Sequence, residues 1–317
     1  MSVPLLLAPM AEISHRAFRE LAEGFGGCDC YFTEMISSGA LLADGPFEKW
    51  YVDTGPVPEK LIFQIVGHDS GQICQAAAFL DRIDCAGIDI NMGCSAPIIR
   101  KGGGGAAWMA SIDKAGELIS QVRPQVKRRL SVKLRIGFKD DFQYLADFCR
   151  RLEAEGVEMI TLHPRMVTEK FTRTARWEYV GMLKQELKIP VTGNGDIASA
   201  RDLVHRAAGP CDAVMIGRAA IKHPWIFDTA RKIEGGVKAE DIEKPGIKQI
   251  EEYGLRFLEL LAKHQPPEFH TSRAKRFFGL FCDNLKFGNY LINELNRENT
   301  LRGIEEEWRD YFIENEE

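Results

Sequence analysis

The sequence lacks any Cys-x-x-Cys pair, although it contains eight cysteines. This spacing disfavours a structural zinc site or an iron–sulfur cluster. Its apolar runs all fall short of the ~18 residues that a membrane-spanning helix needs. Residues 1–8 lack the basic start of a secretion signal, and we interpret them as a first strand. We therefore expect reduced thiols, a cytoplasmic location, no metal ion and no membrane partner.

The chain also lacks a net positive charge, since its formal charge is −5 over 317 residues. This balance disfavours attraction of the whole surface to nucleic acid, but it allows a local basic patch. Such a patch is predicted where Arg273, Lys275 and Arg276 precede Phe277 and Phe278. Basic residues beside aromatic ones can hold phosphates and stack bases. The alternative is that the aromatic residues form a helical core and the charges lie on a solvated face.

No glycine-rich dinucleotide fingerprint follows the first apolar run, which disfavours a doubly wound open sheet. Short apolar runs instead alternate with amphipathic segments. Most of these runs are continuous, as expected of parallel strands that are buried on both faces. The pattern predicts a (β/α)8 barrel. We expect its strands at residues 4–8, 30–34, 61–66, 87–90, 131–136, 159–163, 190–192 and 213–216.

The pattern changes after about residue 240, where signals for strands end. A long helix is predicted over 247–263, and Pro266 and Pro267 should end it. Turn-forming residues are frequent in the preceding linker. We therefore predict a catalytic barrel over residues 1–240 and a small helical domain over residues 241–317.

Polar residues close almost every apolar run, at the barrel end where active sites are built. Asn91 and Cys94 follow the fourth run, Lys133 lies in the fifth, and His163 closes the sixth. A cysteine in this position is a candidate acid or nucleophile. The alternative is a buried structural cysteine, because free cysteine is among the most buried residue types.

The last strand ends predict a phosphate site. Turns at Gly195 and Gly217 let an anion approach backbone N–H groups, and Arg218 can pair with it. Lys133 adds a cation, and Gln64 offers an amide that suits the edge of a heterocycle. Together these residues indicate a flavin mononucleotide (FMN) site.

Seven short motifs, one per strand, carry a resemblance to a known family. They are Ala8-Pro9-Met10-Ala11, Phe63-Gln64-Ile65, Asp89-Ile90-Asn91-Met92-Gly93-Cys94, Val132-Lys133-Leu134-Arg135, His163-Pro164-Arg165, Asn194-Gly195-Asp196-Ile197 and Met215-Ile216-Gly217-Arg218-Ala219. On these motifs the sequence resembles the tRNA-dihydrouridine synthases, flavoenzymes that reduce uridine in RNA. The resemblance spans residues 5–220, and the family's barrel followed by a helical domain matches the predicted layout.

The resemblance implies FMN as cofactor, NADPH or NADH as reductant, and RNA, in particular tRNA, as substrate. It implies that hydride passes from the flavin to C6 of uracil and that Cys94 supplies the proton to C5. A cysteine thiol is mostly protonated near neutral pH and suits that role. The implied FMN ligands are Pro9, Met10, Ala11, Gln64, Lys133, His163, Asn194, Gly195, Asp196, Gly217 and Arg218. The predicted substrate contacts are Asn91, Lys133, His163, Arg165, Arg273 and Lys275.

One loop departs from the family pattern. Proline usually follows the cysteine directly, whereas here Pro97 stands three places after Cys94 and four glycines follow at 102–105. We expect this loop to differ in shape or mobility. Two other functions stay open, namely an FMN-dependent dehydrogenase of the dihydroorotate or dihydropyrimidine type and a non-catalytic RNA-binding barrel. A monomer acting on one RNA is the simplest assembly.

Overall fold

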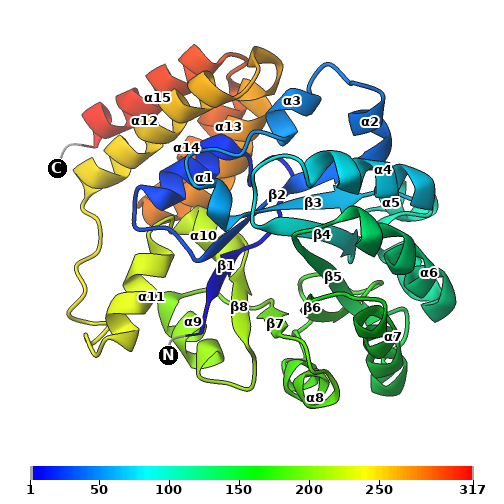
Figure 1. Cartoon of the computed structure of the whole chain (residues 1–317). Helices are drawn as coiled ribbons and strands as arrows, with labels where there is room; N and C mark the ends of the chain where they lie inside the picture. The colour runs from blue at the N-terminus through cyan, green and yellow to red at the C-terminus, as the bar shows by residue number, and fades with distance from the viewer. Residues whose placement is uncertain (1–2, 316–317) are drawn as a thin grey trace.

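The computed structural model describes residues 3–315, and its centre is a closed barrel of eight parallel strands (Figure 1). The strands are β1 Leu5–Leu7, β2 Cys30–Ser37, β3 Leu61–Val66, β4 Gly87–Met92, β5 Arg129–Gly137, β6 Met159–Met166, β7 Val191–Asn194 and β8 Ala213–Ile216. They pair in sequence order, and β1 also pairs with β8, which closes the barrel. The predicted (β/α)8 barrel is therefore confirmed, strand by strand.

Five strands extend further at their carboxyl ends than the apolar pattern predicts. The clearest case is β6, which continues beyond His163 through Arg165 to Met166. Arg135 of β5 lies opposite His163, and the register between the two strands shifts before Gly137. The predicted strand ended at His163, whereas main-chain pairing continues into the polar end of the barrel. Functional side chains therefore stand on strands as well as on loops.

Helices surround the barrel. They are α1 Arg16–Glu23, α2 Ser38–Leu42, α3 Glu48–Tyr51, α4 Ser70–Leu80, α5 Pro97–Lys101, α6 Ile112–Val122, α7 Phe142–Ala154, α8 Glu178–Glu186, α9 Ala200–Ala207, α10 Arg218–Lys222 and α11 Ile226–Glu234. The cap of α4 is Asp69, whose side chain accepts from the Gln72 N–H at 2.8 Å. No helix within residues 3–315 is long and apolar enough to cross a membrane.

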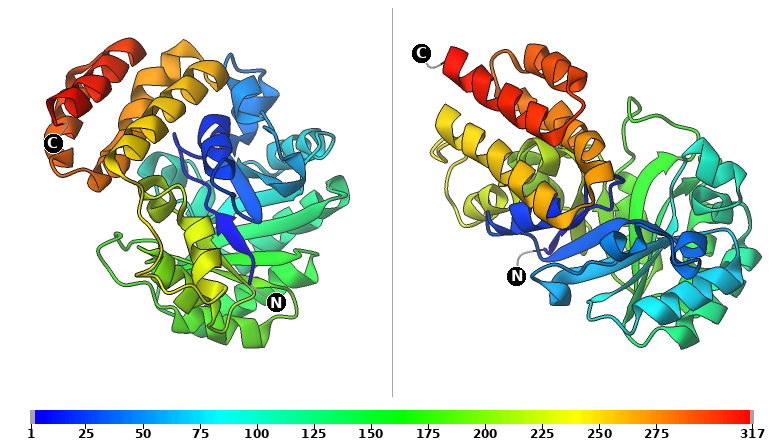
Figure 2. Two further views of the ribbon diagram at one scale, coloured as in Figure 1. Left: turned by 90° about the vertical axis from the view of Figure 1, so that its left-hand side faces the viewer. Right: turned by 90° about the horizontal axis from the view of Figure 1, so that it is seen from above.

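The last four helices form a layer on one side of the barrel (Figure 2). They are α12 Ile247–His264, α13 Pro267–Phe281, α14 Gly288–Arg297 and α15 Leu301–Glu314. Pro266 and Pro267 separate α12 from α13, as predicted. In this layer α12 packs on α1 and α13 packs on α10, so both ends of the barrel sequence contact the helical region. The boundary at residues 240 and 241 stays a prediction.

Aromatic side chains form the core of the helical region. The rings of Phe257 and Phe277 stack with centroids 3.8 Å apart, and Phe278 lies 4.5 Å from Trp308. Phe18 of α1 joins this cluster at 6.2 Å from Phe277. Phe277 and Phe278 are buried, so they are not available to stack on RNA bases. The alternative of a helical core is correct for these residues.

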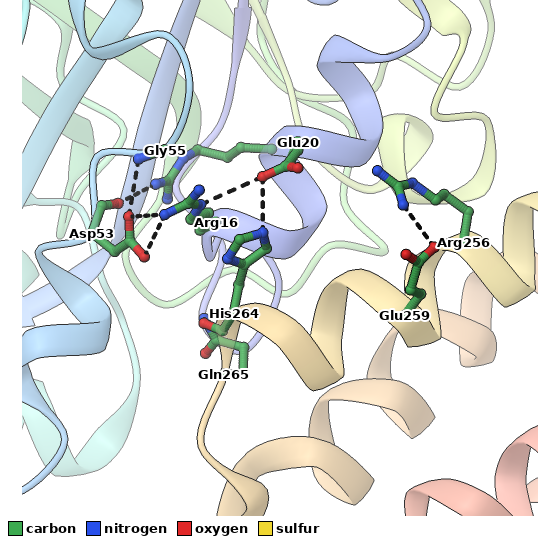
Figure 3. A network of polar contacts seen from close by, with 9 residues as sticks. Arg16, Glu20, Asp53, Gly55, Arg256, Glu259, His264 and Gln265 are labelled. Atoms are coloured by element: carbon green, nitrogen blue, oxygen red, sulfur yellow. Dashed lines mark hydrogen bonds and ion pairs between the residues drawn. The ribbon is translucent and has the colours of Figure 1, made fainter.

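A polar network attaches the end of α12 to the barrel (Figure 3). Glu20 of α1 contacts the His264 Nε2 at 3.0 Å and Arg16 at 3.4 Å. Arg16 also pairs with Asp53 at 3.0 Å. Beside it the buried Arg19 donates to the Asp53 carbonyl at 2.5 Å, and its other donor reaches the Ser14 carbonyl. The last turn of α12 therefore meets Glu20 of α1, and Arg16 links Glu20 to Asp53.

Candidate active site

Cys94 lies just beyond β4, on a partly exposed turn. The Asn91 side chain holds this turn, because its Oδ1 accepts from the Gly93 N–H at 3.1 Å and the Cys94 N–H at 2.8 Å. This local bond is the one that asparagine commonly makes to main chain two or three residues ahead. The thiol of Cys94 is therefore presented at the carboxyl end of β4 from a fixed main-chain position.

The glycine run closes over Cys94 from the other side. The Ala106 N–H donates to the Cys94 carbonyl at 3.0 Å. Gly105 has φ +56°, and a Cβ there would lie 2.8 Å from the same carbonyl oxygen. A Cβ on Gly104 would lie 2.9 Å from the Gly67 carbonyl. Close main-chain approach therefore requires glycine at both positions. Pro97, displaced in the sequence, begins α5, where a missing N–H is tolerated.

A chain of buried polar groups lies behind Cys94. Gln64 Nε2 donates to Asp89 Oδ2 at 2.7 Å, and Gln64 Oε1 accepts from Asn91 Nδ2 at 2.8 Å. Ser131 donates to Asp89 Oδ1 at 2.6 Å. Burial raises the pKa of Asp89 to about 6, although both hydrogen bonds and the nearby Lys133 oppose that shift. Gln64, a predicted FMN ligand, is fully buried within this series of hydrogen-bonded groups.

Asp89 and Ser131 were not among the predicted site residues. A signal for Asp89 was present, because it stands two places before Asn91 in an otherwise apolar strand. Residues two apart in a strand point to the same side. Ser131 gave a weaker signal, because small hydroxyl residues are common at the start of strands. Its role depends on β4 and β5 pairing with Asp89 opposite Ser131.

Two cations, Lys133 of β5 and Arg218 at the start of α10, have no partner within residues 3–315. Neither the Lys133 ammonium nor the Arg218 guanidinium makes an ion pair or hydrogen bond within residues 3–315. Burial lowers the pKa of Lys133 to about 8, while Asp89 opposes the shift. The guanidinium of Arg218 lies over the ring of Phe171, 4.8 Å from its centroid. Unpaired cations in one site are suited to an anionic ligand such as FMN.

His163 is a neutral donor in this site. Arg165 Nη1 lies 2.8 Å from the His163 Nε2, so this nitrogen must accept and Nδ1 must carry the proton. Burial lowers the pKa of His163 to about 2, and the charge of Lys133 acts in the same direction. Its ring stacks on Phe171 at 5.9 Å. His163 can therefore offer an N–H to a cofactor or substrate, without a positive charge.

Arg165, a predicted substrate contact, instead holds the segment after β6 in place. Its side chain is buried, and its guanidinium bonds to Asp196, to the Phe171 carbonyl at 3.2 Å and to the Arg173 carbonyl at 2.5 Å. Asp196 also accepts from the Ala175 N–H at 2.6 Å. These bonds use the donors of Arg165 inside the protein. The contact of Arg165 with substrate stays a prediction.

The turns after β7 and β8 bring the other predicted FMN ligands together. Asn194 Nδ2 donates to the Met215 carbonyl at 2.8 Å, which ties β7 to β8. Gly195 has φ +116°, and a Cβ there would lie 2.9 Å from the ring of His163. A Cβ on Gly217 would lie 3.6 Å from the sulfur of Met10, so the ends of β8 and β1 are adjacent. Pro9 and Ala11 flank Met10 in the same partly exposed segment.

The predicted basic patch on α13 is divided between two roles. Arg273 is 2% exposed and lies 2.7 Å from Glu34 in β2, with its guanidinium over the ring of Phe269. Glu34 also accepts from the Glu12 N–H at 2.6 Å. Arg273 therefore joins α13 to the barrel, and its contact with RNA stays a prediction. Lys275 is partly exposed and donates to the Asn296 carbonyl at 2.8 Å.

Fold and site together define a (β/α)8-barrel protein with a cysteine just beyond β4 and, within residues 3–315, two unpaired cations in β5 and α10. The model of the dihydrouridine synthase family matches residues 6–267. The chain therefore belongs to the dihydrouridine synthase family.

Individual relatives agree with this assignment. A probable tRNA-dihydrouridine synthase of Rhodobacter capsulatus is 34% identical over 228 residues, which cover 70% of this chain and 69% of that protein. A probable tRNA-dihydrouridine synthase of Aquifex aeolicus is 28% identical over 313 residues, which cover 95% of each chain. A solved structure of a 2-naphthoyl-CoA reductase complex has a TM-score of 0.56 at 12% identity, covering 75% of this chain and 51% of that one. This last likeness concerns the fold alone.

Proposed function

We propose that the protein reduces uridines in tRNA to 5,6-dihydrouridine, with FMN as its cofactor and NADPH or NADH as the reductant. Membership of the dihydrouridine synthase family and relatives named as tRNA-dihydrouridine synthases support this proposal. The observation that carries it is the position of Cys94. This thiol is partly exposed on a turn anchored from both sides, at the same end of the barrel as Lys133 and Arg218.

The residues present fit FMN. The unpaired Arg218 and the turns at Gly195 and Gly217 would hold the phosphate, because guanidinium and main-chain N–H groups both favour an anion there. Lys133 and the neutral His163 would face the ring system with a cation and a hydrogen-bond donor. When bound and reduced, FMN supplies a hydride to C6 of the uracil.

Cys94 completes the reduction by protonating C5. Addition of hydride at C6 leaves negative charge on C5 and the adjacent carbonyl, and this charge requires a proton. The S–H bond of Cys94 breaks as the C5–H bond forms, which leaves a thiolate. Asn91 keeps one amide hydrogen beyond its bond to Gln64 and can donate it to the base. The uracil must leave its stack to reach these groups.

An anaerobic assay with the Cys94→Ala variant tests the proposal. We expect purified wild-type protein to bind flavin, to be reduced by NADPH and to be reoxidised by unmodified tRNA with formation of dihydrouridine. Cys94→Ala should keep its flavin but lose about 10²–10⁴-fold in the rate of reoxidation by tRNA, the usual contribution of a general acid. Cys74→Ala is the matched control, because Cys74 is also partly exposed but lies on α4.

Three other outcomes would contradict parts of the proposal. Unchanged turnover in Cys94→Ala would remove the thiol as the acid. Bound flavin that does not react with tRNA but reacts with dihydroorotate or a free pyrimidine would favour the dehydrogenase. Tight tRNA binding by a folded protein that takes up no flavin would favour the non-catalytic RNA-binding barrel.

A further inference from the structure

We propose that Asp89 is a positioning residue that fixes the place of Cys94 through the amides of Gln64 and Asn91. The chain of contacts runs from the Asp89 carboxylate to Gln64 at 2.7 Å, from Gln64 to Asn91 at 2.8 Å, and from Asn91 to the Cys94 N–H at 2.8 Å. Its role in the reaction rests on the proposed function, but its effect on the turn at Cys94 does not.

The groups at the two ends of this series of hydrogen bonds fix the orientation of the side-chain amides of Gln64 and Asn91. At one end the main-chain N–H groups of Gly93 and Cys94 can only donate, so Asn91 must turn its oxygen toward them. Its nitrogen then faces Gln64, which must present its oxygen. The nitrogen of Gln64 is left facing Asp89, and an ionised carboxylate can only accept. No other orientation of the two amides satisfies every group.

Because these groups are buried, reversed orientations of the two amides are strongly disfavoured. Asp89 and Gln64 have no exposed surface, and Asn91 is 6% exposed, so water does not replace a lost partner easily. A reversed Gln64 amide would set its oxygen against the Asp89 carboxylate. A reversed Asn91 amide would set its N–H groups against the N–H of Cys94. Each error leaves a buried polar group without a partner, which is costly.

Ser131 contacts Asp89 but lies outside the series of hydrogen bonds that joins Asp89 to Cys94. Its hydroxyl donates to Asp89 Oδ1 at 2.6 Å, whereas Gln64 uses Oδ2. Removing the hydroxyl leaves all bonds between Asp89 and Cys94 in place. Ser131→Ala is therefore a matched control for loss of one buried hydrogen bond to the same carboxylate.

The direct test measures alkylation of Cys94 by iodoacetamide, with each thiol followed by peptide mapping. Cys74 is an internal reference, because it is also partly exposed and lies outside the chain of contacts. We expect Asp89→Leu to raise the rate at Cys94 relative to Cys74 by roughly fivefold or more, the effect of losing about one net hydrogen bond that closes the turn. Ser131→Ala should change this ratio little.

Two further variants distinguish the effect of the hydrogen bonds between Asp89 and Cys94 from the effect of the negative charge of Asp89. Asp89→Asn can still offer an oxygen to Gln64 if its nitrogen faces Ser131, whose hydroxyl then accepts, so the ratio should stay near that of the wild type. Gln64→Met breaks the middle of the chain and should raise the ratio as Asp89→Leu does. The double variant should add nothing further. Gln64→Met also keeps the test decisive if Asp89→Leu fails to fold.

Activity gives the second readout. Per bound flavin, Asp89→Leu should slow reoxidation by tRNA about 10- to 100-fold with little change in the KM for tRNA, since small misplacement of a reacting group has effects of this size. Equal effects of Asp89→Asn and Asp89→Leu would assign the role to charge and overturn the proposal. An unchanged alkylation ratio in both Asp89→Leu and Gln64→Met would also overturn it. A changed ratio in a protein that does not reduce tRNA would refute the proposed function alone.

Discussion

Two cations of the barrel, Lys133 and Arg218, differ from the arginines on α13 in what surrounds them. Lys133 and Arg218 make no ion pair or hydrogen bond within residues 3–315. Arg273 and Arg276 on α13 are paired with the carboxylates of Glu34 and Glu12, at 2.7 and 2.8 Å. The first set keeps its charge available to a ligand, whereas the second set joins the helical region to the barrel.

This difference indicates that basic residues beside aromatic ones in a sequence can pair with carboxylates rather than stay free for a ligand. Burying an ion pair removes both charges from water, and their attraction then offsets that cost only while both partners remain. Arg273 is therefore held to Glu34 by a buried ion pair. Four substitutions, in order of expected effect, test whether the division between free and paired cations holds.

The largest effect is expected for Arg273→Met. Glu34 and Arg273 are both nearly fully buried, at 4% and 2% exposed, so the change leaves a buried carboxylate without its counter-charge. We expect the free energy of unfolding to fall by about 3–5 kcal/mol, measured by denaturant titration. Adding Glu34→Gln should restore part of this loss, because the remaining group is then uncharged. A single variant as stable as the wild type would show that the pair does not hold α13 to the barrel.

The second effect concerns the free cations. Arg218→Met should weaken FMN binding about 10- to 100-fold, the size expected for losing hydrogen bonds to a charged phosphate. Fluorescence titration of flavin-free protein measures this affinity. Arg276→Met removes an arginine that is already paired with Glu12, and it should leave FMN affinity unchanged. Equal losses in the two variants would remove the distinction between them.

The sequence predicted the barrel and the place of Cys94 because both depend on short-range patterns. Continuous apolar runs mark buried parallel strands, and a cysteine after such a run lies at the strand's end. The burial of Arg273 depends instead on Glu34, which is distant in the chain and carries no local signal. The role of Asp89 likewise depends on three strands pairing in one register. Such contacts follow from tertiary packing, which no motif describes.

Lys133 gives a smaller, pH-dependent effect. Burial lowers its pKa to about 8, so in the flavin-free protein its ammonium is charged below that pH and neutral above it. Anionic FMN favours the charged form, and its affinity should therefore decline as pH rises through about 8, by up to about tenfold per unit. The variant Lys133→Met cannot titrate and should show no decline in this range. Flavin titrations at several pH values measure both profiles, and a wild-type profile that is flat from pH 7 to 9 would contradict the expectation.

The smallest effect is expected for Lys275, which belongs to neither set. It is partly exposed, and within residues 3–315 its ammonium contacts the Asn296 carbonyl but no carboxylate. Its charge is therefore not neutralised, and it stays the predicted RNA contact on α13. Lys275→Met should reduce the slope of log affinity for tRNA against log salt concentration by about 1, as expected for one lost phosphate contact. Arg276→Met should reduce it less, because Glu12 already balances that charge. If both slopes match the wild type, the cations of α13 serve only the contact between the helical region and the barrel, and tRNA must be held by other surfaces.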